Sequence, residues 1–371
     1  MTFNLTDIIL LLGISQGFFL ALSLHLIKNR NKAANRVISY LLLISALMLF
    51  GRIVIFRIPL DWVWRFGVLA DTTIFLFGPF LYTYARRLVF EETPAFFLKW
   101  FHFIPAGLHL CYYFWALTLP LSAFNELYFS GKLNLMFFIV EAAGVVSFIY
   151  YWVSTFRIVR RYAKLEEKTL SFRQNVLNYL YVLLGILGVF IALWTVSFVS
   201  ANFLLKPFTY INYTTMWIST PFFIYIIGYF SFRQPDIFKL PHTSKKKQES
   251  ERLKPEQIQK LQKRLHYFMM EEKVFLKPDL TLQELATKMD TTTNNLSWLL
   301  NQVHQSTFYE YINKHRLEEF LLKLKEDEHN KHTLLALAMD SGFNTKSTFN
   351  RVFKSLMGTT PTQYLKSRSV A

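Results

Sequence analysis

Seven stretches of about 20 mostly apolar residues fill the first 240 positions of this 371-residue chain. A helix that crosses the hydrocarbon core of a bilayer needs about 20 such residues, and buried helices of water-soluble proteins rarely stay apolar for so long. We therefore predict an all-α fold that begins with a transmembrane domain over residues 1–232. Its seven spanning helices are expected at 6–27, 37–56, 67–85, 100–119, 134–156, 177–200 and 210–230.

The positive charges of the loops predict how these helices are oriented. The loops that follow the first, third, fifth and seventh stretches hold 15 Lys and Arg, whereas the other loops hold 4. Loops rich in Lys and Arg stay in the cytoplasm. The N-terminus is therefore expected outside and the C-terminus in the cytoplasm, with the lipid bilayer as a partner.

Ionisable residues inside the apolar stretches are the candidates for a ligand site, because charged groups in lipid are costly and often functional. Besides His25 and His102, which lie near the ends of their stretches, they are Arg52, Asp71, His109 and Glu141, and Glu141, well inside the fifth stretch, is the strongest candidate. Two interpretations stay open: a ligand pocket in which Glu141 pairs with His109 or Arg52, or interhelical hydrogen bonds with no ligand. No metal, cofactor or catalytic group is predicted, because no metal-ligand spacing, nucleophile–base pair or phosphate-binding loop appears, and Cys111 is the single cysteine.

The composition changes after Leu240, where the sequence becomes that of a soluble helical domain. Residues 233–254 read as a basic linker, and residues 255–276 as an amphipathic connecting helix. Apolar residues recur along this helix at steps of three and four, at Ile258, Leu261, Leu265, Phe268 and Met269. This stripe either packs on the following domain or forms a short seam between the two copies of a homodimer.

A first helix-turn-helix pattern follows. Leu282, Leu285 and Ala286 mark the inner face of a short helix, and the polar turn DTTT separates it from a second helix. That second helix turns Leu296, Leu299, Leu300 and Val303 inward. Its early residues are left facing outward, where they can reach a major groove: Thr293, Asn294, Asn295, Ser297, Trp298 and Asn301.

A second pattern of the same kind occupies the end of the chain. Leu334, Leu337 and Ala338 mark its first helix, and Gly342 permits the turn. The next helix packs Phe349, Val352 and Phe353 inward and exposes Lys346, Ser347, Asn350, Arg351 and Lys354. Between the two patterns, FYEYINKHRLEEFLLKLKE reads as one continuous amphipathic helix, a rigid spacer that would let both readers address adjacent major-groove segments.

The stretch GFNTKSTFNRVFKSLMGTTPTQY resembles the signature of AraC/XylS-type transcription regulators. The matching positions are Gly342, Phe343, Ser347, Phe349, Arg351, Phe353, Lys354, Gly358, Thr360, Pro361 and Tyr364. The resemblance implies a double helix-turn-helix domain at 277–371 that binds double-stranded promoter DNA and activates transcription, with RNA polymerase as a partner. It also implies base contacts from the outward residues of the first unit and from Thr345, Lys346, Ser347 and Asn350 of the second.

The two units differ in charge. Arg351 and Lys354 are expected to hold phosphates, which position a protein on DNA without reading its sequence. No Lys or Arg occurs between Lys288 and Lys314, so the first unit should release few counterions on binding. It either reads bases through Asn and Thr or is the weaker partner of the second unit.

Together these features predict a one-component regulator in the inner (cytoplasmic) membrane of a bacterium, in which the helix bundle detects an unknown signal ligand. Two alternatives remain at this stage. The chain could be a transporter or membrane enzyme with a regulatory DNA-binding tail, or its membrane half could act only as an anchor.

Overall fold

The computed structural model describes residues 4–27, 31–57, 69–91, 94–233, 240–241, 255–325 and 332–369. It divides into two compact units, and the division does not follow the order of the chain. Unit 1 comprises Met1–Arg161 and Asn175–His242, whereas unit 2 comprises Tyr162–Gln174 and Thr243–Ala371. The fold is helical, as predicted, apart from two paired segments of two residues each in unit 1.

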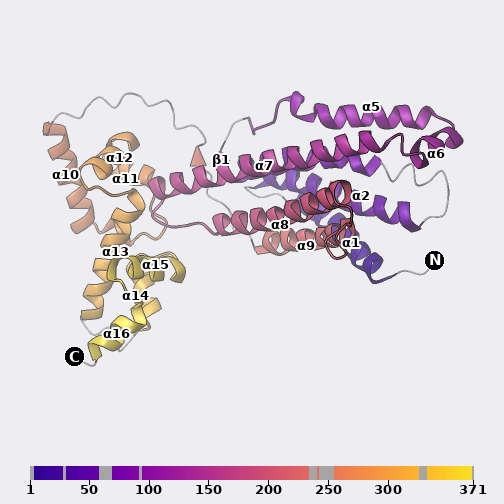
Figure 1. The fold of residues 1–371 in the computed structure, drawn as a ribbon. Helices are drawn as coiled ribbons and strands as arrows, with labels where there is room; N and C mark the ends of the chain where they lie inside the picture. The colour runs from indigo at the N-terminus through magenta and orange to yellow at the C-terminus, as the bar shows by residue number, and fades with distance from the viewer. Residues whose placement is uncertain are drawn as a thin grey trace. The chain divides into compact units, whose positions relative to one another are not determined.

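Unit 1 contains the long apolar helices, and α7, α8 and α9 run alongside one another within it (Figure 1). Helix α1 packs against α2 and α9, and α2 packs against α4. The short parallel strands are β1 (Phe90–Glu91) and β2 (Leu240–Pro241). The helical elements are α1 (Leu5–Leu26), α2 (Lys32–Arg57), η1 (Ala70–Thr73), α4 (Ile74–Val89), η2 (Trp100–Phe103), α5 (Ile104–Thr118), α6 (Leu121–Phe129), α7 (Asn134–Thr169), α8 (Asn175–Phe203) and α9 (Tyr213–Arg233).

Four of the helices in the described ranges are long and apolar enough to cross a membrane: α1, α2, α7 and α8. The other three predicted spans correspond to α4, α5 and α9. Helices α4 and α5 have 16 and 15 residues and α9 has 21, and none of the three is among the candidate spans of the described ranges. The structure therefore supports an apolar helical bundle, while the predicted count of seven spans is not confirmed.

Unit 2 is built from shorter helices and from the last turns of α7. Its elements are α10 (Pro255–Met270), η3 (Val274–Leu276), α11 (Leu282–Lys288), α12 (Thr293–Gln302), α13 (Phe308–Lys325), α14 (Leu334–Asp340), α15 (Lys346–Met357) and α16 (Pro361–Ser369). Most of the predicted linker 233–254 lies outside the described residues.

Two hydrophobic cores hold unit 2 together, and helix α13 contributes to both. Its first turns place Phe308 and Ile312 in the core formed with α10, α11 and α12. Its later turns place Phe320 and Leu324 in the core formed with α14 and α15. Because one continuous helix belongs to both cores, it fixes the spacing of the two halves, as the amphipathic pattern predicted.

The apolar stripe of α10 is part of the first core. Leu261, Leu265 and Met269 are buried there, and Ile258 and Phe268 pack against its edge. The stripe is therefore used within the unit, which favours packing over a dimer seam. One inward prediction was wrong: Val303 is 37% exposed, because α12 ends at Gln302 and leaves Val303 as its C-cap.

Candidate functional site

Unit 2 contains two pairs of short helices, α11 with α12 and α14 with α15. A threonine is the N-cap of each of these four helices. In each case the threonine side chain accepts a hydrogen bond from the backbone N–H three residues later, which satisfies a donor that the helix itself cannot pair. The hydrogen-bonded residues are Thr281 with Glu284, Thr292 with Asn295, Thr333 with Ala336, and Thr345 with Thr348. These caps fix where both candidate recognition helices, α12 and α15, start.

The turns inside the two pairs also match. Each contains one residue with positive φ: Asp290 at 50° before α12 and Gly342 at 91° before α15. A Cβ added at Gly342 would lie 2.5 Å from the carbonyl oxygen of Phe275 in η3. This position therefore requires glycine for its backbone conformation and for the close approach of η3.

Helix α15 presents a basic stripe. Lys346, Asn350 and Lys354 are exposed and stand four residues apart, so they lie on one side of the helix. Neither lysine has an ion pair within the described part of the chain. Phe349 and Phe353 are buried in the second core on the opposite side. The stripe, together with the exposed Ser347, has the exposure and charge that phosphate and groove contacts require.

Two other predicted contact residues of this half are engaged inside unit 2. Thr345 is the N-cap of α15, and its hydroxyl lies 3.1 Å from the Ser347 hydroxyl. Arg351 donates from Nη2 to the Tyr309 hydroxyl of α13 at 2.5 Å, and its guanidinium lies 5.3 Å from the centre of the Tyr309 ring. Arg351 therefore fastens α15 to the spacer helix.

The predicted reading face of α12 is uncharged and only partly exposed. Asn294 and Asn301 are exposed, whereas Trp298 packs against the first core. Asn301 donates from Nδ2 to the Ser297 carbonyl at 2.6 Å, which folds its amide back onto its own helix. The remaining predicted residues on this face, Thr293, Asn295 and Ser297, are half-buried.

Sequence reasoning missed the contribution of residues 162–174, which it treated as a loop of the membrane domain. In the structure they belong to unit 2. Leu170 pairs with Thr281 in an isolated antiparallel bridge, and the Ser171 hydroxyl donates to the Leu280 carbonyl at 2.7 Å. We call residues 162–174 the inserted segment.

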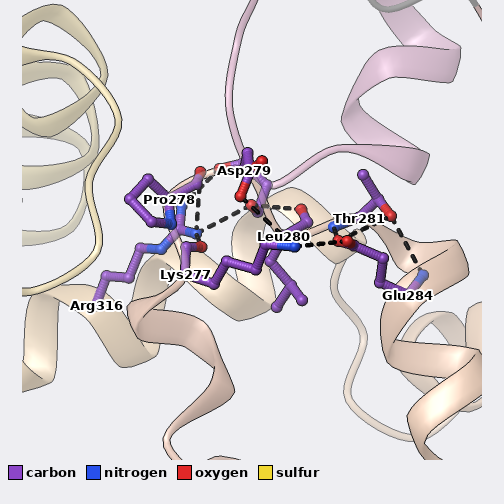
Figure 2. A network of polar contacts seen from close by, with 8 residues as sticks. Lys277, Pro278, Asp279, Leu280, Thr281, Glu284 and Arg316 are labelled. Carbon is purple, nitrogen blue, oxygen red and sulfur yellow. Dashed lines mark hydrogen bonds and ion pairs between the residues drawn. The ribbon is translucent and has the colours of Figure 1, made fainter.

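Arg316 of α13 binds the inserted segment. Its side chain is fully buried and donates from Nε to the Phe275 carbonyl at 2.7 Å and from Nη2 to the Lys277 carbonyl at 2.6 Å. Figure 2 shows the Arg316 side chain beside Lys277 and Pro278. These two residues belong to the loop that leads to the Thr281–Glu284 cap. Arg316 also donates to the Ser171 carbonyl at 3.0 Å. Burial lowers the pKa of Arg316 to about 10, so it remains charged at neutral pH, with carbonyl oxygens as its acceptors.

Tyr309 connects the inserted segment to the candidate recognition helix α15. The guanidinium groups of Arg173 and Arg351 lie 5.7 and 5.3 Å from the centre of its ring, within the range of cation–π attraction. One aromatic side chain thus contacts the inserted segment and α15. No periodicity in the sequence signals this arrangement, because the three residues are separated by more than 40 positions.

A cavity of about 450 Å³ lies within unit 1. The four ionisable residues singled out from the sequence, Arg52, Asp71, His109 and Glu141, all line it. Arg52 forms an ion pair with Asp71 at 3.4 Å and stacks 4.1 Å above the centre of the Trp217 ring. The pairing of charged groups away from lipid is the arrangement expected for such residues in a membrane bundle.

Glu141 makes different contacts from those expected. Its Oε1 accepts from Trp194 Nε1 at 2.9 Å, and its Oε2 accepts from the Tyr213 hydroxyl at 3.0 Å. His109 is instead hydrogen-bonded to Thr72 at 2.7 Å. Among the described residues, no group of three or more His, Cys, Asp or Glu side chains could hold a metal ion.

Residues 285–367 match the family model of a helix-turn-helix domain. The matched range begins inside α11 and includes α12, the spacer helix α13, α14 and α15, and the model is of the AraC type. No similar curated protein and no similar solved structure was found for the chain. Residues 285–367 therefore form an AraC-type helix-turn-helix domain, which indicates a DNA-binding transcription regulator.

Proposed function

We propose that this protein is a membrane-tethered, one-component transcription regulator in which the apolar bundle senses a signal and unit 2 acts on promoter DNA. The observation that carries the proposal is the inserted segment. It connects two long apolar helices, α7 and α8, and it is also an integral part of the unit that contains the helix-turn-helix domain.

The positive charges near this segment support a cytoplasmic location. Six Lys and Arg lie between residues 157 and 174, more than in any other loop of the predicted topology. Loop charge and residue contacts are independent observations, and both support the proposal that the segment lies on the side where DNA is found. The same orientation leaves the N-terminus outside the cytoplasm.

The proposed route of the signal follows α7. This helix is continuous over 36 residues, from Asn134 in unit 1 to Thr169 beside the bonded Ser171. A shift or rotation of α7 would therefore change the contacts of Ser171 with Arg316 and of Arg173 with Tyr309. A ligand that favours one arrangement of the bundle would shift the population of DNA-binding conformations.

Mapping of bound DNA across the genome tests the regulator. We expect specific sites for the full-length protein and a loss of most of them in a K346A/K354A variant. A K314A variant is the matched control, because Lys314 is exposed on α13 and lies outside the basic stripe. No specific sites for the wild-type protein would overturn the proposal.

A crosslink tests sensing against simple anchoring. A Cβ at Gly144 of α7 would lie 2.5 Å from Ile74 Cγ2 of α4, so the cysteines of an I74C/G144C pair would lie close together, and crosslinking on oxidation is checked first by thiol titration. The variant carries C111S to remove the exposed native thiol. We expect promoter output to differ between the oxidised and reduced forms of the same variant. Equal output under both conditions would favour an anchor.

A further inference from the structure

We infer that the cavity of unit 1 binds a small organic cation, an amine or quaternary ammonium group attached to an apolar or aromatic body. This inference rests on the proposed sensing function and names the class of ligand. It follows from the charges that line the cavity, the chemistry of its walls and the positions of its residues along the helices.

Among the described residues, the cavity holds one carboxylate that forms no ion pair, that of Glu141. Arg52 and Asp71 form an ion pair. Glu141 receives hydrogen bonds only from the neutral groups of Trp194 and Tyr213 among the described residues. Both bonds are donated to the carboxylate oxygens, which offsets part of the cost of burying the charge of Glu141. With Glu141 ionised and His109 neutral, the groups of the cavity sum to a formal charge of about −1, and a bound monovalent cation would balance it and offset the remaining cost.

The walls of the cavity suit the rest of such a ligand. Nine of the 19 residues that line it are Phe, Tyr or Trp, and the faces of such rings attract cations within about 6 Å of the ring centre. The stacking of Arg52 on Trp217 is an example already present in the structure. Further aromatic residues surround the same space: Phe77, Tyr112, Phe148, Phe190 and Trp194.

The volume and position of the cavity fit a small molecule that arrives from outside the cytoplasm. Its 450 Å³ falls within the range of about 300–1,000 Å³ typical of ligand sites. Arg52 lies near the end of α2, Glu141 near the start of α7, and Tyr213 at the start of α9. In the predicted topology, these are the ends of the helices that face outward.

The same geometry is less suited to anions and zwitterions. A ligand carboxylate would seek Arg52, whose guanidinium is already paired with Asp71 and stacked on Trp217. It would also approach a cavity that contains two carboxylates. A neutral ligand would leave the charge of Glu141 unbalanced. An organic cation would pair with the Glu141 carboxylate and pack against the aromatic side chains of the cavity.

Four probes that share a phenyl ring on a two-carbon chain and differ in their charged or polar groups test the inference on the full-length protein in detergent. They are 2-phenylethylammonium, 2-phenylethanol, zwitterionic phenylalanine and 3-phenylpropionate. Binding is followed through tryptophan fluorescence, because Trp194 and Trp217 line the cavity. We expect the ammonium probe to bind at least about tenfold more tightly than the other three. A hydrogen bond to a charged partner changes binding affinity by about that factor or more. Equal binding of the ammonium and the alcohol, or tighter binding of an acid, would overturn the inference.

Variants then locate the charge that is responsible. E141Q should lose the preference for the ammonium probe over the alcohol. E126Q is the matched control, because Glu126 is an exposed carboxylate of unit 1 outside the cavity, and this variant should keep the preference. The comparison of probes on the wild-type protein needs no variant, so a poorly folding E141Q would leave that test intact. An E141Q protein that folds and keeps the full preference would contradict the assignment.

The two proposals can fail separately. If the ammonium probe binds and promoter output does not respond to it in cells, the ligand class stands and the sensing proposal fails for that ligand. If no probe shows the expected preference while the full-length protein binds specific DNA sites, the cation inference fails and the regulator proposal stands.

Discussion

Ser171 and Arg316 lie 145 positions apart in the sequence and are joined by two hydrogen bonds, from Nη1 to the Ser171 carbonyl and from Nη2 to its hydroxyl, each at 3.0 Å. Asn313 donates to the same carbonyl at 2.9 Å. These bonds hold a segment that follows an apolar helix inside the unit that contains the DNA-binding domain. The predictions below test this arrangement and the basic stripe.

Replacement of Arg316 should destabilise unit 2 strongly. An R316M variant keeps much of the side-chain volume but leaves the buried Phe275 carbonyl without its donor and removes the bonds to the Lys277 carbonyl and to Ser171. Hydrogen bonds from a charged donor contribute about 1.5–3 kcal/mol each, so we expect a total loss of more than about 3 kcal/mol. Thermal unfolding of the full-length protein measures it. K314A on the same helix should change the midpoint little, and equal effects of both variants would contradict the assigned role.

Two glycines with positive φ should respond differently to substitution by alanine. At Gly342 the added Cβ would meet the Phe275 carbonyl oxygen, whereas at Gly358, with φ of 72°, nothing lies within 4 Å. We expect G358A to cost about 1 kcal/mol from backbone strain alone, and G342A to cost clearly more because the backbone of η3 must also move. Denaturant or thermal unfolding compares the two. A G342A variant as stable as G358A would show that η3 does not pack there.

The stability of unit 2 should fall as the pH rises from about 4.5 to about 7. Glu166 lies in the polar end of α7, beyond the predicted span 134–156, and burial raises the pKa of its carboxyl from an ordinary value of 4.5 to about 7. The unfolded chain releases this proton first, so the native state is favoured below this range and loses stability through it. The shift corresponds to about 3 kcal/mol.

The E166Q variant checks the assignment of this pH dependence. Its amide can still accept the hydrogen bond that Gln174 N–H donates to Glu166 at 2.7 Å. We expect the variant to be more stable than the wild type at pH 8 and to show a flatter profile between pH 4.5 and 7. Arg173, Arg351, Glu167 and Tyr162 also face this group and are unchanged in both proteins. An unaltered pH profile would assign the effect to another group.

The basic stripe should contribute to DNA binding through phosphate contacts. Removal of one such lysine, by K346A or K354A, is expected to reduce the dependence of log K on log salt by about 1. Affinity should fall similarly for specific and non-specific DNA, because phosphate contacts carry no sequence information. Binding measured across a salt series tests this, with K314A as the control. A change confined to the specific site would instead indicate base contacts.

The extent to which the sequence predicts this molecule depends on how local each feature is. The helices of unit 2 follow from the periodicity of residues such as Leu296, Leu299 and Leu300 and from capping threonines, which act within one turn. The identification of Arg52, Asp71 and Glu141 as one group also follows in part, because the cost of charge in lipid turns such residues toward each other.

Long-range partners could not be predicted in this way. Arg316 is spaced like any residue of an amphipathic helix, and nothing in its neighbourhood indicates full burial beside Ser171. Arg351 matched a phosphate contact by charge and position, yet its partner in the structure is Tyr309. Both contacts depend on tertiary packing between distant segments. Hydrophobic periodicity reports only which face of one helix or strand is buried, so it does not predict them.

The inserted segment bears on whether such a regulator can be activated by proteolytic release. A protease that cuts between α9 and α10 would free residues 255–371 but leave Ser171 behind in the N-terminal fragment. Arg316 and Asn313 would then lose the bonds that Ser171 accepts in the intact chain. The freed piece would be less stable than the tethered unit, so we expect cleavage to silence the regulator, and control must be exerted while the chain remains whole.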